Sequence, residues 1–125
     1  MPFLTIDPCD PFFIHASDHP SMTLLPKFLD GTTYAMLRRS MLISLSAKNK
    51  LGFVNGTIST LGESDPKYLL WQRCNYMVLS WILNSLNQEL ANNVLYVETP
   101  SEIWLDLQDL CIIYSLRYLA YKTVS

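Results

Sequence analysis

The sequence has little charge, few glycines and no long uninterrupted hydrophobic run. Only 16% of its 125 residues are charged and four are glycine, whereas 50% are hydrophobic. This balance excludes a disordered chain, and the length favours one domain with its own core. No run reaches the roughly 18 apolar residues that a membrane-spanning helix needs, so we expect no membrane contact.

Cysteine is scarce and widely spaced. The three cysteines, Cys9, Cys74 and Cys111, form no CxxC pair, which excludes the common zinc-finger spacings. An odd number of distant thiols is typical of a reduced, intracellular protein. Residues 1–8 lack the basic start of a secretory signal, and Asp7 interrupts their apolar run. These features predict a cytoplasmic protein.

Catalytic motifs and metal-ligand clusters are missing as well. The sequence contains no GxSxG, P-loop, GxGxxG or HExxH pattern. His15 and His19 have the i, i+4 spacing of zinc ligands on a helix, but Pro20 and its neighbouring prolines argue against a helix there. A polar loop is the favoured interpretation of this pair. We therefore predict no enzyme activity, no metal and no cofactor.

Basic residues are too few for a dedicated nucleic-acid binder. The net charge is −2 and the isoelectric point about 5.5. The densest basic groups are Arg38, Arg39, Lys48 and Lys50. Cations near a helix end also favour the helix dipole, so these four residues are weak nucleic-acid candidates. Only if they shared one face would a nucleic-acid partner become a serious alternative.

The first 22 residues are rich in proline. They hold four of the seven prolines, at positions 2, 8, 11 and 20, which predicts an irregular arm over residues 1–22. Phe12, Phe13 and Ile14 are candidates for anchoring this arm on the core. Residues 22–25 are compatible with a short strand or hairpin that Pro26 ends.

Helical periodicity begins after a turn and N-cap over residues 30–33. Apolar residues then recur at steps of three and four, which predicts an amphipathic helix from Tyr34 to near Lys50. Gly52 is the expected stop signal. Residues 52–58 are expected to be a turn-rich segment with apolar anchors.

Two further helices follow. Asp65 suits the N-cap and Pro66 the first turn of a helix so poor in charge that we place it at the centre of the fold. This helix should break and restart as a shorter one over residues 87–94. Residues 99–102, Thr-Pro-Ser-Glu, form a capping-box signal for a last helix. Residues 111–125 are apolar, with no clear periodicity.

The predicted fold is therefore mainly α, a small bundle of three to five helices. Each of the three tryptophans could stack on bases, but their positions on apolar stripes favour the core. The residues predicted to form the core or to carry family motifs are Tyr34, Met41, Leu51, Gly52, Phe53, Gly56, Trp71, Cys74, Trp81, Ile82, Ile103, Trp104 and Leu107.

Several blocks together resemble a known family. They are Asp-Pro-Phe-Phe-Ile-His at 10–15, Ala-Lys-Asn-Lys-Leu-Gly-Phe-Val-Asn-Gly-Thr-Ile at 47–58, Trp-Gln-Arg-Cys-Asn at 71–75, Met-Val-Leu-Ser-Trp-Ile-Leu-Asn-Ser at 77–85 and Glu-Ile-Trp-Leu-Asp-Leu at 102–107. In this order and spacing they resemble the N-terminal Gag-like region of plant copia-type LTR retrotransposons. The resemblance covers roughly residues 10–109.

The chain departs from that family at Leu37, where the family usually has tryptophan, and throughout residues 111–125. The resemblance therefore divides the chain into an arm at 1–22, a Gag-like helical domain at 23–110 and a divergent tail. The sequence also lacks the zinc knuckle and the enzymes of a full retrotransposon. The resemblance therefore suggests a truncated or degenerate polyprotein fragment.

The resemblance implies a non-enzymatic structural role. Gag-like modules associate with themselves to build the particle that packages element RNA, and RNA binding in the family is attributed mostly to the downstream knuckle. Self-association is thus the expected partnership. A different class of function is also open, namely a host-used adaptor that binds a protein partner in a helical groove.

Overall fold

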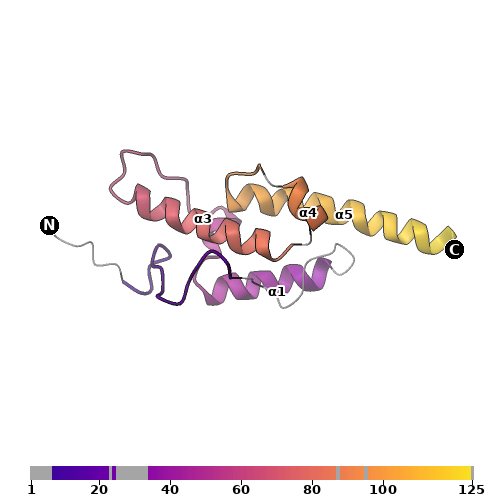
Figure 1. Ribbon diagram of the computed structural model, residues 1–125, viewed down its shortest axis with the longest axis horizontal. Helices are drawn as coiled ribbons and strands as arrows, with labels where there is room; N and C mark the ends of the chain where they lie inside the picture. The colour runs from indigo at the N-terminus through magenta and orange to yellow at the C-terminus, as the bar shows by residue number, and fades with distance from the viewer. Residues whose placement is uncertain (1–6, 23, 25–33, 87, 95, 125) are drawn as a thin grey trace.

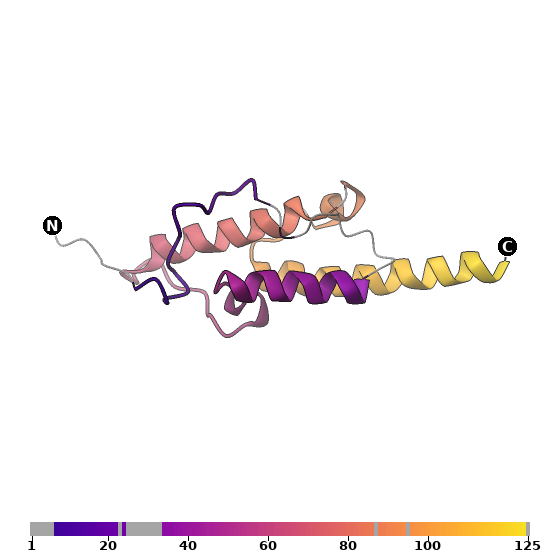
Figure 2. The same cartoon turned by 90° about the horizontal axis from the view of Figure 1, so that it is seen from below.

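The computed structural model describes residues 7–22, 24, 34–86, 88–94 and 96–124, with helices joined by loops (Figures 1 and 2). The helices are α1 (Tyr34–Ala47), α2 (Gly52–Asn55), α3 (Tyr68–Asn84), α4 (Gln88–Asn93) and α5 (Pro100–Val124). The predicted mainly helical class is confirmed. No strand includes Met22 or Leu24, while Thr23, Leu25 and the predicted N-cap at 30–33 lie outside the described residues.

The long helices lie along the long axis of the molecule, and α1 runs in the opposite direction to α3 (Figures 1 and 2). The arm, residues 7–22, passes beside α3 and the end of α1. The last turns of α5 extend past the ends of the other helices. Helix α5 runs through residues 110 and 111 without a break, and the tail as a separate unit stays a prediction.

Helix α1 ends earlier than predicted, because Asn49 stops it rather than Gly52. Asn49 adopts a left-handed backbone with φ of 57°. The amide of Lys50 then donates to the Leu45 carbonyl at 2.8 Å, and the amide of Asn49 donates to the Ser46 carbonyl at 3.0 Å. These two bonds form a Schellman motif, which places Lys48 and Lys50 beyond the helix.

Gly52 instead begins α2, a short helix inside the segment that was expected to be only turns. A Cβ on Gly52 would lie 2.7 Å from the Ile58 side chain, so this position has no room for one. Gly56 closes α2 with φ of 82°, a conformation that favours glycine. Phe53 and Val54 are buried, so the anchoring role expected of this segment is real although its backbone is helical.

The signals before α3 and α5 act differently. Helix α3 begins at Tyr68 with Lys67 as its N-cap and no side-chain cap bond, so the predicted N-cap at Asp65 and first turn at Pro66 were wrong. The Asp65 carboxylate instead accepts the Lys67 amide at 2.8 Å in the turn before the helix. The Thr99 hydroxyl accepts the Glu102 amide at 3.3 Å and donates to the Glu102 carboxylate at 3.0 Å. The predicted break after α3 and the short restart as α4 are confirmed.

The core lies where α1, α2, α3 and α5 meet. Its buried members are Leu24, Met41, Leu45, Phe53, Val54, Trp71, Cys74, Val78, Leu79, Trp81, Ile82, Leu86, Val94, Ile103, Trp104 and Leu107. Phe12 and Ile14 of the arm pack against this cluster. The arm is therefore part of the folded unit rather than an appendage.

Candidate functional site

The arm is held mainly through its backbone carbonyl oxygens. Five side chains at the end of α1 and along α3 donate to six of them, over sequence distances of 37–64 residues. The bonds are Asn49 Nδ2 to Cys9 O at 2.7 Å, Lys50 Nζ to Phe13 O at 2.7 Å, Cys74 Sγ to Phe12 O at 3.2 Å, Trp81 Nε1 to His19 O at 2.8 Å, and Asn84 Nδ2 to Pro20 O at 2.7 Å and to Met22 O at 3.2 Å. We call these five donors the arm clasp.

The arm clasp continues into the core at Ser85. This buried hydroxyl accepts the Leu24 amide at 2.8 Å and donates to the Trp81 carbonyl at 2.8 Å. Ser44 of α1 donates to the Leu24 carbonyl at 3.1 Å. Leu24 thus bridges α1 and α3, and every buried polar group named here has a partner, as a stable interior requires.

Lys50 is the most unusual member of the arm clasp. Only 1% of it is exposed, and its ammonium donates to the Phe13 carbonyl. Burial lowers the pKa of Lys50, while nearby Cys74, Asp18 and Asp10 oppose that shift. A buried cation that donates to the protein's own backbone is unavailable to a phosphate. Lys50 was proposed as a weak nucleic-acid candidate, and the structure places it inside the molecule.

The other three candidate cations do not form a common face with Lys50. Lys48 lies 3.6 Å from the Asp18 carboxylate and 4.9 Å above the Trp81 ring. Arg38 lies 5.7 Å from the centre of the Trp104 ring, near the other end of α1. Arg39 is exposed beside it. The basic face that would have favoured a nucleic-acid partner is not assembled from these residues.

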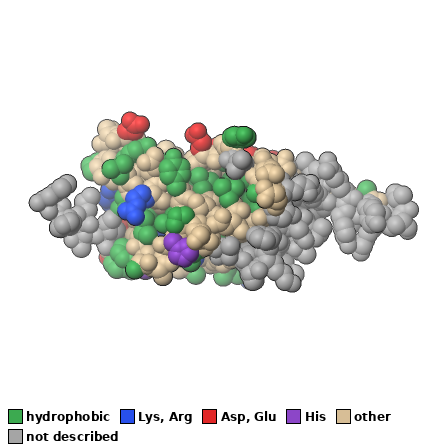
Figure 3. Space-filling view, in the orientation of Figure 1, with side chains coloured by type: hydrophobic (Ala, Val, Ile, Leu, Met, Phe, Trp, Pro, Cys, Tyr) green, Lys and Arg blue, Asp and Glu red, His purple; other side chains and the backbone are tan. Residues whose placement is uncertain are grey.

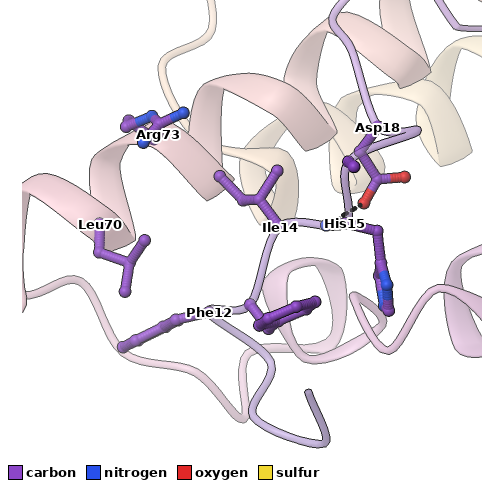
Figure 4. A pocket seen from close by; sticks show the side chains of 8 residues that line it. Phe12, Ile14, His15, Asp18, Leu70 and Arg73 are labelled. Atoms are coloured by element: carbon purple, nitrogen blue, oxygen red, sulfur yellow. Dashed lines mark hydrogen bonds between the residues drawn. The ribbon is translucent and has the colours of Figure 1, made fainter. Parts of the chain in front are cut away.

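A hollow of about 480 Å³ lies between the arm and α3 (Figure 4). Arg73 and Leu70 line it from α3, and Ile14, His15 and Asp18 line it from the arm. Asp18 accepts the His15 amide at 3.1 Å. In Figure 4, Arg73 and Asp18 lie on opposite sides of Ile14, so charged groups do not converge on one point as catalysis requires.

The predicted core and motif residues fall into three groups. Met41, Phe53, Trp71, Cys74, Trp81, Ile82, Ile103, Trp104 and Leu107 are buried. Leu51 and Gly52 are half-buried and Gly56 is exposed. The side chains of Tyr34 and Leu37 lie outside the description. The sequence did not indicate that Asn49, Asn84 and Ser85 hold the arm and Leu24. The only signal for them was their polar character within or next to an apolar helix.

The two described cysteines lie in opposite environments. Cys9 is exposed, whereas Cys74 is buried, and burial raises the pKa of the Cys74 thiol to about 11. Because the thiolate is the reactive form, we expect an alkylating reagent at pH 8 to label Cys9 at least tenfold faster than Cys74. Mass spectrometry of the two peptides over time measures both rates. Equal rates would show that Cys74 is not enclosed.

No metal-binding group and no membrane-spanning helix are found in the part of the chain that the structure describes. Its His, Cys, Asp and Glu side chains form no cluster of three. The His19 ring instead shares a hydrogen bond of 2.7 Å with the Ser21 hydroxyl, and His15 packs edge-on against Phe13. None of the helices combines the length and the hydropathy needed to cross a bilayer.

A family model matches part of the chain. Residues 15–60 match the family described as Gag-polypeptide of LTR copia-type. No curated protein and no solved structure matches the chain. The matched segment contains half of the arm, together with α1 and α2. It also contains two members of the arm clasp, Asn49 and Lys50, and the neighbouring Lys48. The match supports a copia-type Gag-like domain over residues 15–60 and confirms the resemblance noted in the sequence for that segment.

Proposed function

We propose that this protein is a non-catalytic self-association module with a Gag-related structural role. One observation carries the proposal: among the described residues, seven large hydrophobic side chains are exposed, six of them on helices and one, Tyr96, in the loop before α5. They are Ile43, Leu69, Tyr76, Tyr96, Leu105, Ile112 and Leu116. Single exposed hydrophobic residues are common, but five of these seven follow straight lines on α3 and α5.

Low charge strengthens this argument. On the face seen in Figure 3, hydrophobic side chains lie in several groups with few charged side chains between them. A surface that is weakly charged and partly apolar favours association between copies, because little electrostatic repulsion opposes the burial of apolar area. The family match agrees, since it assigns the chain a Gag-like domain.

Molar mass in solution tests the proposal. We expect light scattering after size-exclusion chromatography to give a mass that rises with protein concentration from the 14.4 kDa monomer to defined oligomers. The same measurement in high salt separates apolar from electrostatic contributions. A monomeric mass at every concentration would refute self-association as the function.

A second candidate function rests on the outer face of α1. Arg39, Leu42, Ile43, Ser46 and Ala47 line a shallow hollow of about 500 Å³ there. Its apolar lining suits the hydrophobic face of a partner helix, which is the adaptor alternative. A protein that stays monomeric yet loses binding to a partner after Ile43→Asp would favour this function.

A further inference from the structure

Helix α3 carries an exposed stripe on the side opposite the core. Leu69 is 72% exposed and Tyr76 55%, and the exposed Arg73 lies between them. The three positions are separated by four and three residues, so they fall on one line along the helix. We call Leu69, Arg73 and Tyr76 the α3 stripe.

Helix α5 carries a second stripe of the same form. Leu105 is 62% exposed and Ile112 50%, and the exposed Asp109 lies between them. Leu116, also 62% exposed, extends the line towards the C-terminus. We call Leu105, Asp109, Ile112 and Leu116 the α5 stripe.

The two stripes have equal spacing and opposite charge. Each has an apolar residue four positions before its charge and another three positions after it. When Arg73 faces Asp109, the apolar residues on either side of the charges also face each other if the two helices are parallel. If the helices are antiparallel, each apolar pair is offset by one residue, a rise of about 1.5 Å. Neither Arg73 nor Asp109 is in an ion pair with any residue that the structure describes.

We propose that the α3 stripe of one copy packs against the α5 stripe of a second copy, with Arg73 facing Asp109. This proposal rests on the self-association put forward above and names its two surfaces. Each copy holds one stripe of each kind, so a contact through one pair of stripes leaves a free stripe at either end. Repetition of that contact produces rings or open assemblies, whereas a two-fold pair of copies would join both pairs of stripes in a closed dimer.

Both stripes are accessible to a second copy. The C-terminal part of α5, towards which the α5 stripe runs, extends past the ends of the other helices (Figures 1 and 2). Arg73 is exposed at the edge of the hollow of Figure 4, so its guanidinium is accessible to a carboxylate on a neighbouring copy. Arg73 is thus placed to form the bidentate contacts that arginine makes with carboxylates.

Charge reversal tests the proposal with the full chain. We expect Arg73→Glu alone and Asp109→Arg alone each to raise the concentration at which oligomers form by at least tenfold, because like charges then face each other. An equimolar mixture of the two variants should assemble like the original protein, since each variant supplies the stripe that fits the other. The double variant should also assemble.

Two matched controls carry the same charge changes outside the stripes. Lys67→Glu and Glu63→Arg are both at exposed positions before α3, and we expect them to leave the oligomer-forming concentration unchanged. Unchanged assembly of both single variants, or a mixture no better than its components, would overturn the paired stripes while leaving self-association intact. A monomeric original protein would refute both proposals together.

Discussion

Replacing Trp81 by alanine should lower the free energy of unfolding by about 3–5 kcal/mol, a typical cost for truncating a buried aromatic side chain. Trp81 is fully buried in α3, its indole N–H donates to the His19 carbonyl, and the Lys48 ammonium lies over its ring. One substitution therefore opens a cavity and also releases the arm. Urea denaturation followed by circular dichroism measures the loss.

Trp81→Phe separates the two contributions. It keeps an aromatic ring in the core but removes the N–H, so we expect a smaller loss of about 1–3 kcal/mol. Faster proteolysis near His19 should accompany it, because the arm loses one of its clasp bonds. A loss below about 1 kcal/mol for Trp81→Ala would contradict the central position of this side chain.

Replacing Lys50 by glutamate should be equally damaging, at about 3–5 kcal/mol, because it buries an unpaired charge. The new carboxylate would face the Phe13 carbonyl, which is an acceptor, and would lie near the carboxylates of Asp10 and Asp18. Both interactions are repulsive in an interior that screens charge poorly. Urea denaturation again gives the value.

Lys67→Glu is the matched control for this charge reversal. Half of the Lys67 side chain is exposed, and its ammonium lies 4.0 Å from the Asp10 carboxylate at the surface. Exposed pairs of this kind contribute less than about 1 kcal/mol, so the control should have a small effect. Equal losses for Lys50→Glu and Lys67→Glu would show that Lys50 is not buried against the arm.

Local signals in the sequence predicted the helices well. The Thr99 cap and the apolar steps of three and four after Tyr34 depend on residues close in the chain, and the structure has the helices that they predict. The end of α1 was wrong because both glycine and asparagine adopt the left-handed conformation. Asn49 comes first along the chain and forms the C-terminal cap of α1. Gly52 is instead required because the Ile58 side chain packs closely against it.

The arm clasp could not be predicted, because its partners are far apart in sequence. Two cations beyond the last turn of a helix normally face water, and nothing local distinguishes Lys50 from Lys48. The difference arises only when Phe13 brings its carbonyl to one of them. The charge-poor α3 was expected to have little exposed surface, yet Leu69 and Tyr76 are exposed because no other described element covers that side.

The arm clasp also sets an order of events during synthesis. Phe12 leaves the ribosome 62 residues before Cys74, and His19 leaves 62 residues before Trp81. At the usual 5–20 residues per second, the arm waits about 3–12 s for the helix that will hold it. Throughout that interval Phe12 and Ile14 lack the α3 side of the core, so two apolar side chains of the nascent arm stay partly exposed to water until α3 emerges.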